Sequence, residues 1–302
     1  MGGIVITGSG GQLGRALAVR LSARSPVLLG HGELDLGDFA AVERVIAGLD
    51  PEVLINAAAF NHVDDAETHA DDAFRANALG PWALARATAR RGALLVHFST
   101  DYVFEGEARK PYTEDDSPAP LGVYGASKLA GERLATTNPR SMVLRTSALY
   151  GEVGGGKGRN FVETMLRLGK DDRAIRVVDD QRISPTSADD LADKTIELVL
   201  RWVTARADDL LGLYHVTNAG DCSWFELATE TLRLAGIDAA IEPISTTEYG
   251  ARAPRPAYSV LARRHLERLG LDDLRPWQDA LRDHLAKRVA QPSAPLNRRS
   301  GT

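Results

Sequence analysis

Short apolar runs alternate along the first half of the chain with longer segments in which apolar residues recur at helical spacing. The runs predict strands at residues 4–7, 27–29, 53–56, 94–98 and 142–145. The intervening segments predict helices at 12–24, 39–48, 70–91 and 124–136. Nearly continuous apolar strands are typical of sheets covered on both faces, and parallel strands require crossover helices. The pattern therefore predicts an α/β fold with a doubly wound parallel sheet over residues 1–150.

The pattern changes after residue 150. A glycine-rich segment at 151–158 cannot hold regular structure cheaply and predicts a lobe boundary or a mobile flap. Beyond it, helices are predicted at 161–168, 188–205, 224–234 and 277–289, with short strands at 176–178 and 213–216. We expect residues 151–290 to form mainly a smaller, mixed α/β substrate-binding lobe, with some elements returning to the first domain. Residues 291–302 have little to bury and predict a disordered tail.

Composition narrows the class of protein. Lys and Arg number 36 and Asp and Glu 41, for a net charge of −5, which gives no reason to expect nucleic acid or a membrane as a partner. The first residues show neither a signal-peptide pattern nor a membrane span. Cys222 is the single cysteine, so no disulfide can form within the chain, and we expect a cytoplasmic location.

A glycine-rich turn follows the first predicted strand. Gly8, Gly11 and Gly14 stand between this strand and a helical segment, where N–H groups at a helix N-terminus favour an anion such as pyrophosphate. This context predicts a Rossmann dinucleotide site, and a βα turn without a ligand is the alternative. After the second strand, Gly-His-Gly at 30–32 offers neither the acid typical of NAD sites nor an arginine for NADP. We expect NADPH or NADH, with a slight preference for NADPH.

Tyr124 and Lys128 lie four residues apart, which places them on one face of a predicted helix. A carbonyl that receives a hydride needs a proton, and a tyrosine can supply it when a nearby ammonium lowers its pKa from about 10. We therefore expect Lys128 to bring the pKa of Tyr124 near the working pH. Thr100 ends the fourth strand, where its hydroxyl can hold the substrate oxygen; Ser99 is the neighbouring alternative.

Four longer stretches resemble one family. They are Leu-Ile-Asn-Ala-Ala-Ala-Phe at 54–60, Ser-Thr-Asp-Tyr-Val-Phe-Glu-Gly at 99–106, the segment 124–132 and Asp-Gln-Arg-Ile-Ser-Pro-Thr at 180–186. They are similar to the dTDP-4-dehydrorhamnose reductase family of extended short-chain dehydrogenases/reductases. The resemblance implies NAD(P)H-dependent reduction of the 4-keto group of a nucleotide-linked 4-keto-6-deoxysugar, as in dTDP-rhamnose biosynthesis. It also implies a nucleotide sugar as the partner and a homodimer as a candidate assembly.

The matching motifs imply three sets of residues. The catalytic residues would be Thr100, Tyr124 and Lys128, with Lys128 also holding ribose hydroxyls of the cofactor. The cofactor would be bound by Gly8, Gly11, Gln12, Leu13, Gly14, Asp35, Leu36, Ala57, Ala58, Ala59, Tyr124 and Lys128. Asp35 and Leu36 resemble the pair that contacts the adenine. The substrate would be bound by Asn61, Val63, Asp101, Tyr102, Asn160 and Arg255.

The chain departs from the family pattern where the family contacts sugar. Ala148 replaces the usual tryptophan, residues 60–64 differ from the usual Tyr-Thr-Ala-Val-Asp, Ile183 replaces a common glycine and Tyr258 an asparagine. The sugar and the nucleotide therefore stay open. Two other functions are alternatives: a non-catalytic dinucleotide-binding regulatory subunit, and a nucleotide-sugar epimerase or dehydratase. No protein-held metal is expected, because the histidines and acids at 62–69 fit no zinc spacing.

Overall fold

The computed structural model describes residues 3–152, 160–171 and 173–290. Its centre is a six-stranded sheet with the strand order β10-β5-β4-β3-β1-β2, in which all neighbours are parallel. The strands are β1 (Ile4–Thr7), β2 (Val27–Leu29), β3 (Val53–Asn56), β4 (Leu94–Thr100), β5 (Ser141–Thr146) and β10 (Gly212–His215). The chain starts at β1, moves outward to β2 and returns on the other side at β3. The predicted doubly wound parallel sheet is confirmed.

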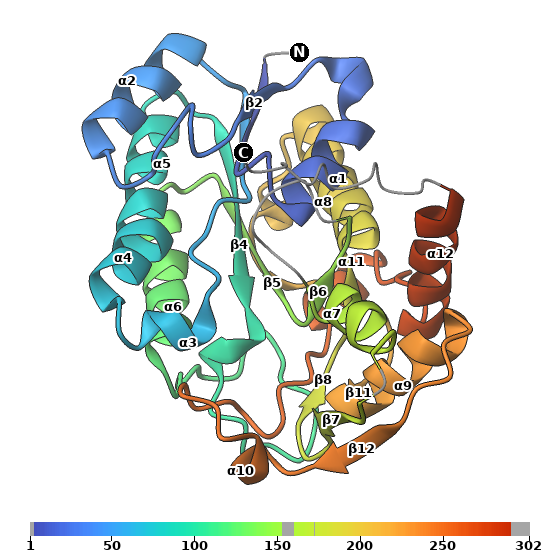
Figure 1. The fold of residues 1–302 in the computed structure, drawn as a ribbon. Helices are drawn as coiled ribbons and strands as arrows, with labels where there is room; N and C mark the ends of the chain where they lie inside the picture. The colour runs from blue at the N-terminus through green and yellow to red at the C-terminus, as the bar shows by residue number, and fades with distance from the viewer. Residues whose placement is uncertain (1–2, 153–159, 172, 291–302) are drawn as a thin grey trace, which may run out of the picture.

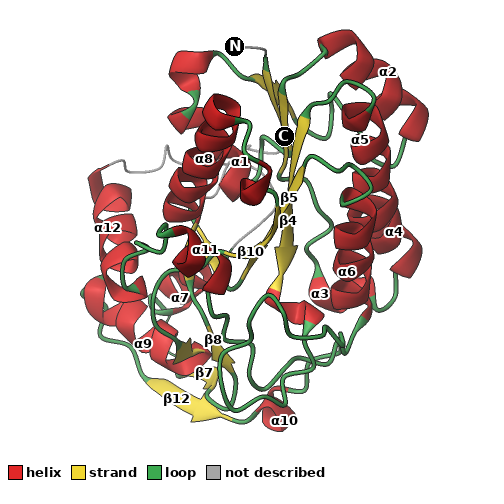
Figure 2. Ribbon diagram, turned by 180° about the vertical axis from the view of Figure 1, so that it is seen from behind, coloured by secondary structure: helices red, strands yellow, loops and turns green. Residues whose placement is uncertain are grey.

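Helices cover both faces of the sheet (Figures 1 and 2). One face carries α1 (Gln12–Arg20) and α8 (Ala188–Ala205), and the other carries α2 (Phe39–Leu49), α5 (Gly80–Ala89) and α6 (Val123–Ala135). Within β3, Val53 and Ile55 pack with the first group of helices and Leu54 with the second. Each central strand is therefore buried on both sides, which explains the continuous apolar runs.

The helix predicted over residues 70–91 is interrupted, so this prediction is wrong in detail. α4 (Ala70–Phe74) leads through a π-helical turn, Arg75–Leu79, into α5. Pro81 has no N–H for the carbonyl of Asn77, four residues earlier, so a regular α-helix cannot continue through this point. The Asn77 carbonyl oxygen instead lies against helix α6. A Cβ added to Gly131 of that helix would be only 2.0 Å from this oxygen.

The first helix also departs from its prediction, because α1 ends at Arg20 and a 3₁₀ turn, Ser22–Arg24, follows it. Ser25 then takes a positive φ of 48°, which ends the helical path before β2. Two further 3₁₀ turns are Asp101–Val103 and Asp208–Leu210.

Much of the second half of the chain forms a smaller group of elements beside the sheet (Figure 1). Its elements are β6 (Leu149–Tyr150), α7 (Phe161–Leu168), β7 (Ile175–Val178), β8 (Arg182–Ile183), β9 (Thr186–Ser187), β11 (Cys222–Ser223), α9 (Trp224–Leu234), β12 (Ile241–Ile244), α10 (Thr246–Tyr249) and α12 (Trp277–Ala290). Two elements of this half join the main sheet instead: α8 packs on α1, and β10 pairs with β5. The short helices α3 (Val63–Ala66) and α11 (Arg264–Leu269) flank the sheet.

Two sequence predictions fall partly or wholly outside the described residues. Most of the glycine-rich segment, at 153–159, and the tail at 291–302 are not described, so the flap and the disordered tail stay predictions. In the part of the chain that is described, no helix is long and apolar enough to cross a membrane.

The contact between Gly131 and Asn77 leads to a stability prediction. Gly131→Ala places a Cβ against a backbone oxygen that cannot move alone, so the free energy of unfolding should fall by about 1–3 kcal/mol. Gly48→Ala is the matched control, because Gly48 lies in helix α2 with nothing within 4 Å of the added Cβ. The control should gain about 0.5–1 kcal/mol. Urea denaturation of both variants checks the pair, and equal effects would contradict the close contact.

Candidate active site

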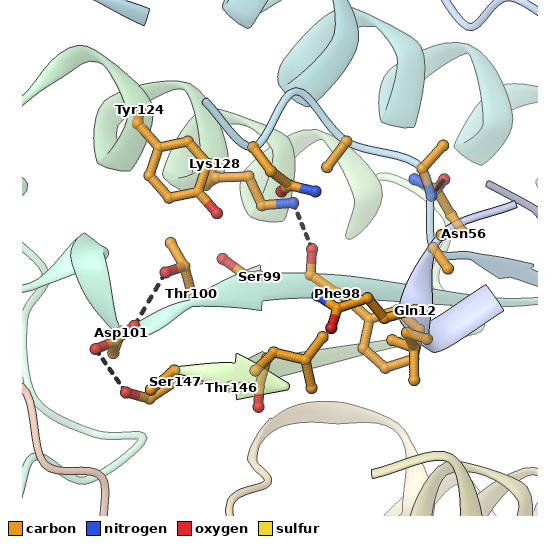
Figure 3. Close-up of a pocket in the computed structure, with 18 of the residues that line it drawn as sticks. Gln12, Asn56, Phe98, Ser99, Thr100, Asp101, Tyr124, Lys128, Thr146 and Ser147 are labelled. Atoms are coloured by element: carbon orange, nitrogen blue, oxygen red, sulfur yellow. Dashed lines mark hydrogen bonds between the residues drawn. The ribbon is translucent and has the colours of Figure 1, made fainter. Parts of the chain in front are cut away.

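A cavity of about 580 Å³ opens at the carboxyl ends of the central strands. It is lined by the turns that follow β1, β3, β4 and β5 and by Tyr124 and Lys128 of α6 (Figure 3). The chain order reverses here, between β1 and β3, and open α/β sheets bind their ligands at such switch points. Of the predicted cofactor residues, those that line the cavity are Gly11, Gln12, Leu13, Ala57, Ala58, Ala59, Tyr124 and Lys128.

The glycine turn has the geometry that a dinucleotide requires. Gly8 has a φ of 68°, and a Cβ on it would lie 2.5 Å from the backbone nitrogen of Ala58. A Cβ on Gly14 would lie 2.2 Å from the Gly8 carbonyl oxygen. Helix α1 begins at Gln12 without a side-chain cap and without an acid in its first turn, which leaves N–H groups for an anion. These residues therefore fit the pyrophosphate of a nicotinamide dinucleotide.

The structure brings Thr100, Tyr124 and Lys128 together at one end of the cavity (Figure 3). The Lys128 side chain is buried, and its Nζ donates a hydrogen bond to the Phe98 carbonyl oxygen over 2.6 Å. The phenol of Tyr124 lies beside the Thr100 hydroxyl, which favours the ionised form of the phenol. The hydroxyl of Thr100 donates to Asp101 over 3.1 Å. Its oxygen accepts from the Tyr102 backbone N–H over 3.2 Å.

Three hydroxyl groups at this end of the cavity donate to Asp101. It is buried, and besides the bond from Thr100 it accepts hydrogen bonds from Ser147 over 2.8 Å and from Ser259 over 2.5 Å. The three hydroxyls come from the end of β4, from the turn after β5 and from a segment far along the chain. Burial raises the pKa of Asp101 to about 6, and the three hydrogen bonds oppose this rise.

The expected lowering of the Tyr124 pKa by Lys128 is wrong for this structure. Burial raises the pKa of Tyr124 to about 12, and the Thr100 hydroxyl opposes this rise. Burial also lowers the pKa of Lys128 to about 8, and the negative charge of Glu132 opposes that change. The Lys128 ammonium donates to the Phe98 carbonyl. Burial of the phenol is the largest effect on the pKa of Tyr124. Tyr124 therefore holds its proton firmly at neutral pH.

Four predicted substrate residues lie in or next to the cavity. Asn61 and Asp101 line it directly. Val63 and Tyr102 line a much smaller adjoining cavity, which they share with Tyr124. The rings of Tyr102 and Tyr124 meet edge to face with their centroids 6.0 Å apart. Tyr124 lines both cavities and therefore lies between them.

Two other predicted substrate residues do not line the cavity, because their polar groups are used elsewhere. Arg255 forms an ion pair with Asp64, with a 2.8 Å contact, and donates to the Ala253 carbonyl. Both amide protons of Asn160 are donated, one to Gln12 over 2.7 Å and one to the Gly151 carbonyl over 2.8 Å. These two side chains hold segments of the chain together in the structure.

Asp35 and Leu36, the residues predicted to contact the adenine, do not line the cavity either. Leu36 is buried in the core and packs against Gly80, and Asp35 accepts a hydrogen bond from the Gly37 backbone over 2.8 Å. Glu33, which sequence reasoning did not single out, lies in the turn after β2, where its side chain accepts from the Gly30 backbone over 2.8 Å. Rossmann sites for NAD commonly hold an acid near this point of the chain.

Sequence reasoning also missed the contribution of β5. Thr146 and Ser147 line the cavity because Thr146 stands opposite Thr100 in the parallel register. The hydroxyls of Ser99 and Thr146 are buried without a hydrogen-bond partner among the described residues. The sequence signal that could have identified them is the pair of polar residues at the end of a buried strand.

The departures from the family pattern lie in different surroundings. Ala148 lines the cavity with a φ of 43°, whereas Ile183 and Tyr258 pack in apolar clusters. Among the charged residues at 62–69, Asp64 binds Arg255 and Glu67 accepts from the Val123 backbone at the start of α6. No group of three metal-binding side chains occurs in the ranges that the structure describes.

Fold and site together define a nicotinamide-dinucleotide-dependent oxidoreductase of the short-chain dehydrogenase type. Residues 1–290 match the family described as RmlD substrate binding domain. The chain is 39% identical to dTDP-4-dehydrorhamnose reductase of Streptomyces griseus, covering 97% of this chain and 96% of that protein. It is 41% identical to a probable dTDP-4,6-dihydroxy-2-methyloxan-3-one 4-ketoreductase of Streptomyces antibioticus, covering 97% and 98%.

A solved structure agrees with these relatives. The crystal structure of dTDP-4-dehydrorhamnose reductase from Bacillus anthracis in complex with NADP superimposes with a TM-score of 0.87 at 37% identity, covering 95% of this chain and 99% of that one. The protein belongs to the dTDP-4-dehydrorhamnose reductase family, and the resemblance found in the sequence is confirmed.

The raised pKa of Asp101 leads to a pH prediction. An aspartate in the unfolded chain titrates near pH 4, so the folded state binds this proton more tightly, and stability from this group is lost as the pH rises from about 4 to about 6. The Asp101→Asn variant has no carboxyl group at this position, so it does not show this loss of stability. The free energy of unfolding of the variant relative to the parent should therefore rise by on the order of 2–3 kcal/mol between about pH 4 and pH 7.

Urea denaturation of both proteins at each pH measures this difference. Because other carboxylates titrate equally in the two proteins, their contributions cancel. A difference that is constant with pH would contradict a raised pKa at Asp101.

Proposed function

We propose that this protein reduces the 4-keto group of a nucleotide-linked 4-keto-6-deoxysugar with NADPH or NADH, and that Tyr124 donates the proton. The observation that carries the proposal is the meeting of Thr100, Tyr124 and Lys128 at the end of a dinucleotide cavity. The relatives that match nearly the whole chain are named as reductases of such dTDP-linked sugars.

The bound dinucleotide supplies the hydride, and the chain supplies the proton. As the carbonyl carbon gains a hydride, its oxygen gains negative charge and becomes far more basic than a phenolate. A phenol with a pKa of about 12 is fully protonated before the reaction and still gives its proton to that oxygen. The O–H bond of Tyr124 breaks, a new O–H bond forms on the sugar, and the charge moves to the phenolate.

Thr100 and Lys128 complete the site. The Thr100 hydroxyl lies beside the phenol and opposes the rise that burial causes in the Tyr124 pKa. The ammonium of Lys128 stabilises the phenolate after proton transfer and holds ribose hydroxyls of the dinucleotide. A proton from solvent must then restore the phenol before the next turnover.

Of the departures from the family pattern, Ala148, Asn61 and His62 line the cavity, so the sugar and the nucleotide stay open. Purified protein is therefore incubated with a panel of nucleotide-linked 4-ketosugars, and the absorbance of NADPH and NADH is followed separately. Stoichiometric oxidation of the dinucleotide with one sugar supports the proposal. Conversion without net oxidation would indicate an epimerase or dehydratase, and binding without any conversion would indicate a regulatory subunit.

Tyr124→Phe tests the proton donor. The variant keeps the ring but loses the proton, so kcat should fall by about 10²–10⁴-fold while the affinity for NADPH changes by less than about threefold. Tyr249→Phe is the matched control, because this exposed tyrosine at the end of α10 does not line the cavity, and its kcat should stay within about tenfold of the parent value. Stopped-flow kinetics and fluorescence titration provide the two readouts. Loss of NADPH binding in Tyr124→Phe would assign the residue a structural role instead.

A further inference from the structure

Helix α6 carries a third buried polar residue in line with the two proposed catalytic side chains. Tyr124, Lys128 and Glu132 follow one another at intervals of four residues, so they share one face of the helix. Glu132 and Lys128 are both buried, with 4% and 3% of their surfaces exposed. Charged side chains are almost never buried this deeply unless they are paired.

The Glu132 carboxylate is held in a fixed position by Arg145 of β5. The two form a bidentate ion pair, with contacts of 2.8 Å and 2.7 Å. Arg145 is itself buried and lies 5.1 Å from the centre of the Phe104 ring. Its guanidinium also approaches Nε2 of His215 at 3.5 Å. The carboxylate therefore cannot turn away from the helix face without breaking a buried pair.

Within the described residues, no carboxylate accepts a hydrogen bond from Lys128. Its Nζ donates to one neutral acceptor, the Phe98 carbonyl oxygen. A buried ammonium with a single neutral acceptor tends to lose its proton, because burial disfavours the charged form. Some negative charge nearby must oppose this tendency if the ammonium is to act on a ribose or a phenolate.

The titratable and charged groups around Lys128 come from three elements. They are Tyr124 and Glu132 on α6, His97 and Asp101 on or directly after β4, and Arg145 on β5. Tyr124 is neutral, and burial with the charge of Lys128 lowers the pKa of His97 well below its usual value, so it is neutral too. The carboxylate of Asp101 is occupied by three hydroxyl groups. Glu132 is the carboxylate that remains.

We propose that Glu132, clamped by Arg145, is the positioning residue that keeps the Lys128 ammonium charged and available to the dinucleotide. The inference rests on the proposed role of Lys128 in holding the cofactor. The attraction of Glu132 raises the pKa of Lys128, which opposes the effect of burial. Arg145 acts through Glu132: it fixes the carboxylate and offsets the desolvation of that charge.

The test measures NADPH affinity by fluorescence titration from about pH 7 to pH 10. In the parent protein the affinity should decline as Lys128 loses its proton, with an inflection near pH 8, because the pKa of Lys128 is about 8. Glu132→Gln should move this inflection down by about one pH unit or more. Adenosine 2′,5′-bisphosphate lacks the nicotinamide ribose, so its affinity should show no such shift, and it also reports whether each variant is folded.

A second variant covers the case in which Glu132→Gln leaves Arg145 unpaired and fails to fold. The double variant Glu132→Met with Arg145→Met removes both charges of the pair and keeps an apolar filling. Its inflection should also move down, but by less than in Glu132→Gln, because removing the Arg145 cation acts in the opposite direction. The matched control is Glu230→Gln, which breaks an exposed glutamate–arginine pair on α9 and should leave the inflection in place.

The results separate this inference from the proposed function. If Lys128→Met leaves the NADPH affinity and its pH dependence unchanged, the proposed role of Lys128 is wrong. If Lys128→Met removes the inflection but a folded Glu132 variant keeps it within about 0.2 pH units of the parent, the inference on Glu132 is overturned. A downward shift in both Glu132 variants, with no shift in the control variant, supports it.

Discussion

The buried carboxylate of Asp101 joins three segments that are far apart in the sequence. A charge without water is costly, and the hydroxyls of Thr100, Ser147 and Ser259 offset part of that cost by donating to it. The Thr100 hydroxyl also lines the cavity, as Tyr124 does. The direction of that hydroxyl and the attachment of the segment around Ser259 to the sheet therefore depend on the same carboxylate.

Helix α6 places the remaining groups because it lies unusually close to its neighbours. Gly131 admits the backbone of the π-helical turn, where Pro81 has left a carbonyl without its helical partner. Interruptions of this kind are common near functional sites. The close packing buries Lys128 and Glu132 on the inner face of the helix, and burial is what moves the pKa of Lys128 into a range where a neighbouring charge has a large effect.

Polar contacts hold the smaller group of elements against the sheet. Asn160 binds Gln12 of the dinucleotide turn, Arg255 binds Asp64, and Ser259 binds Asp101. The resemblance assigned two of these residues, Asn160 and Arg255, to the substrate; this stays a prediction, and in the structure both have partners within the chain. Apolar clusters fill the interior of each part, whereas these bonds fix where the parts meet, at the rim of the cavity. Directional bonds suit this task because a shift in position breaks them.

Local pattern alone predicted the strands of the central sheet, most helix limits and the glycine turn, because burial on two faces and helical spacing both produce a periodic pattern in the sequence. The short strands β6, β8, β9, β11 and β12 were not predicted. Local pattern also placed Tyr124 and Lys128 on one helix face, since their spacing is a property of the helix. The break at Pro81, the partners of Asn160 and Arg255, and the contribution of Thr146 required the tertiary structure. The high pKa of Tyr124 also required the tertiary structure. Desolvation depends on all the groups packed around the phenol, and neighbours that are distant in the sequence produce no periodic pattern there.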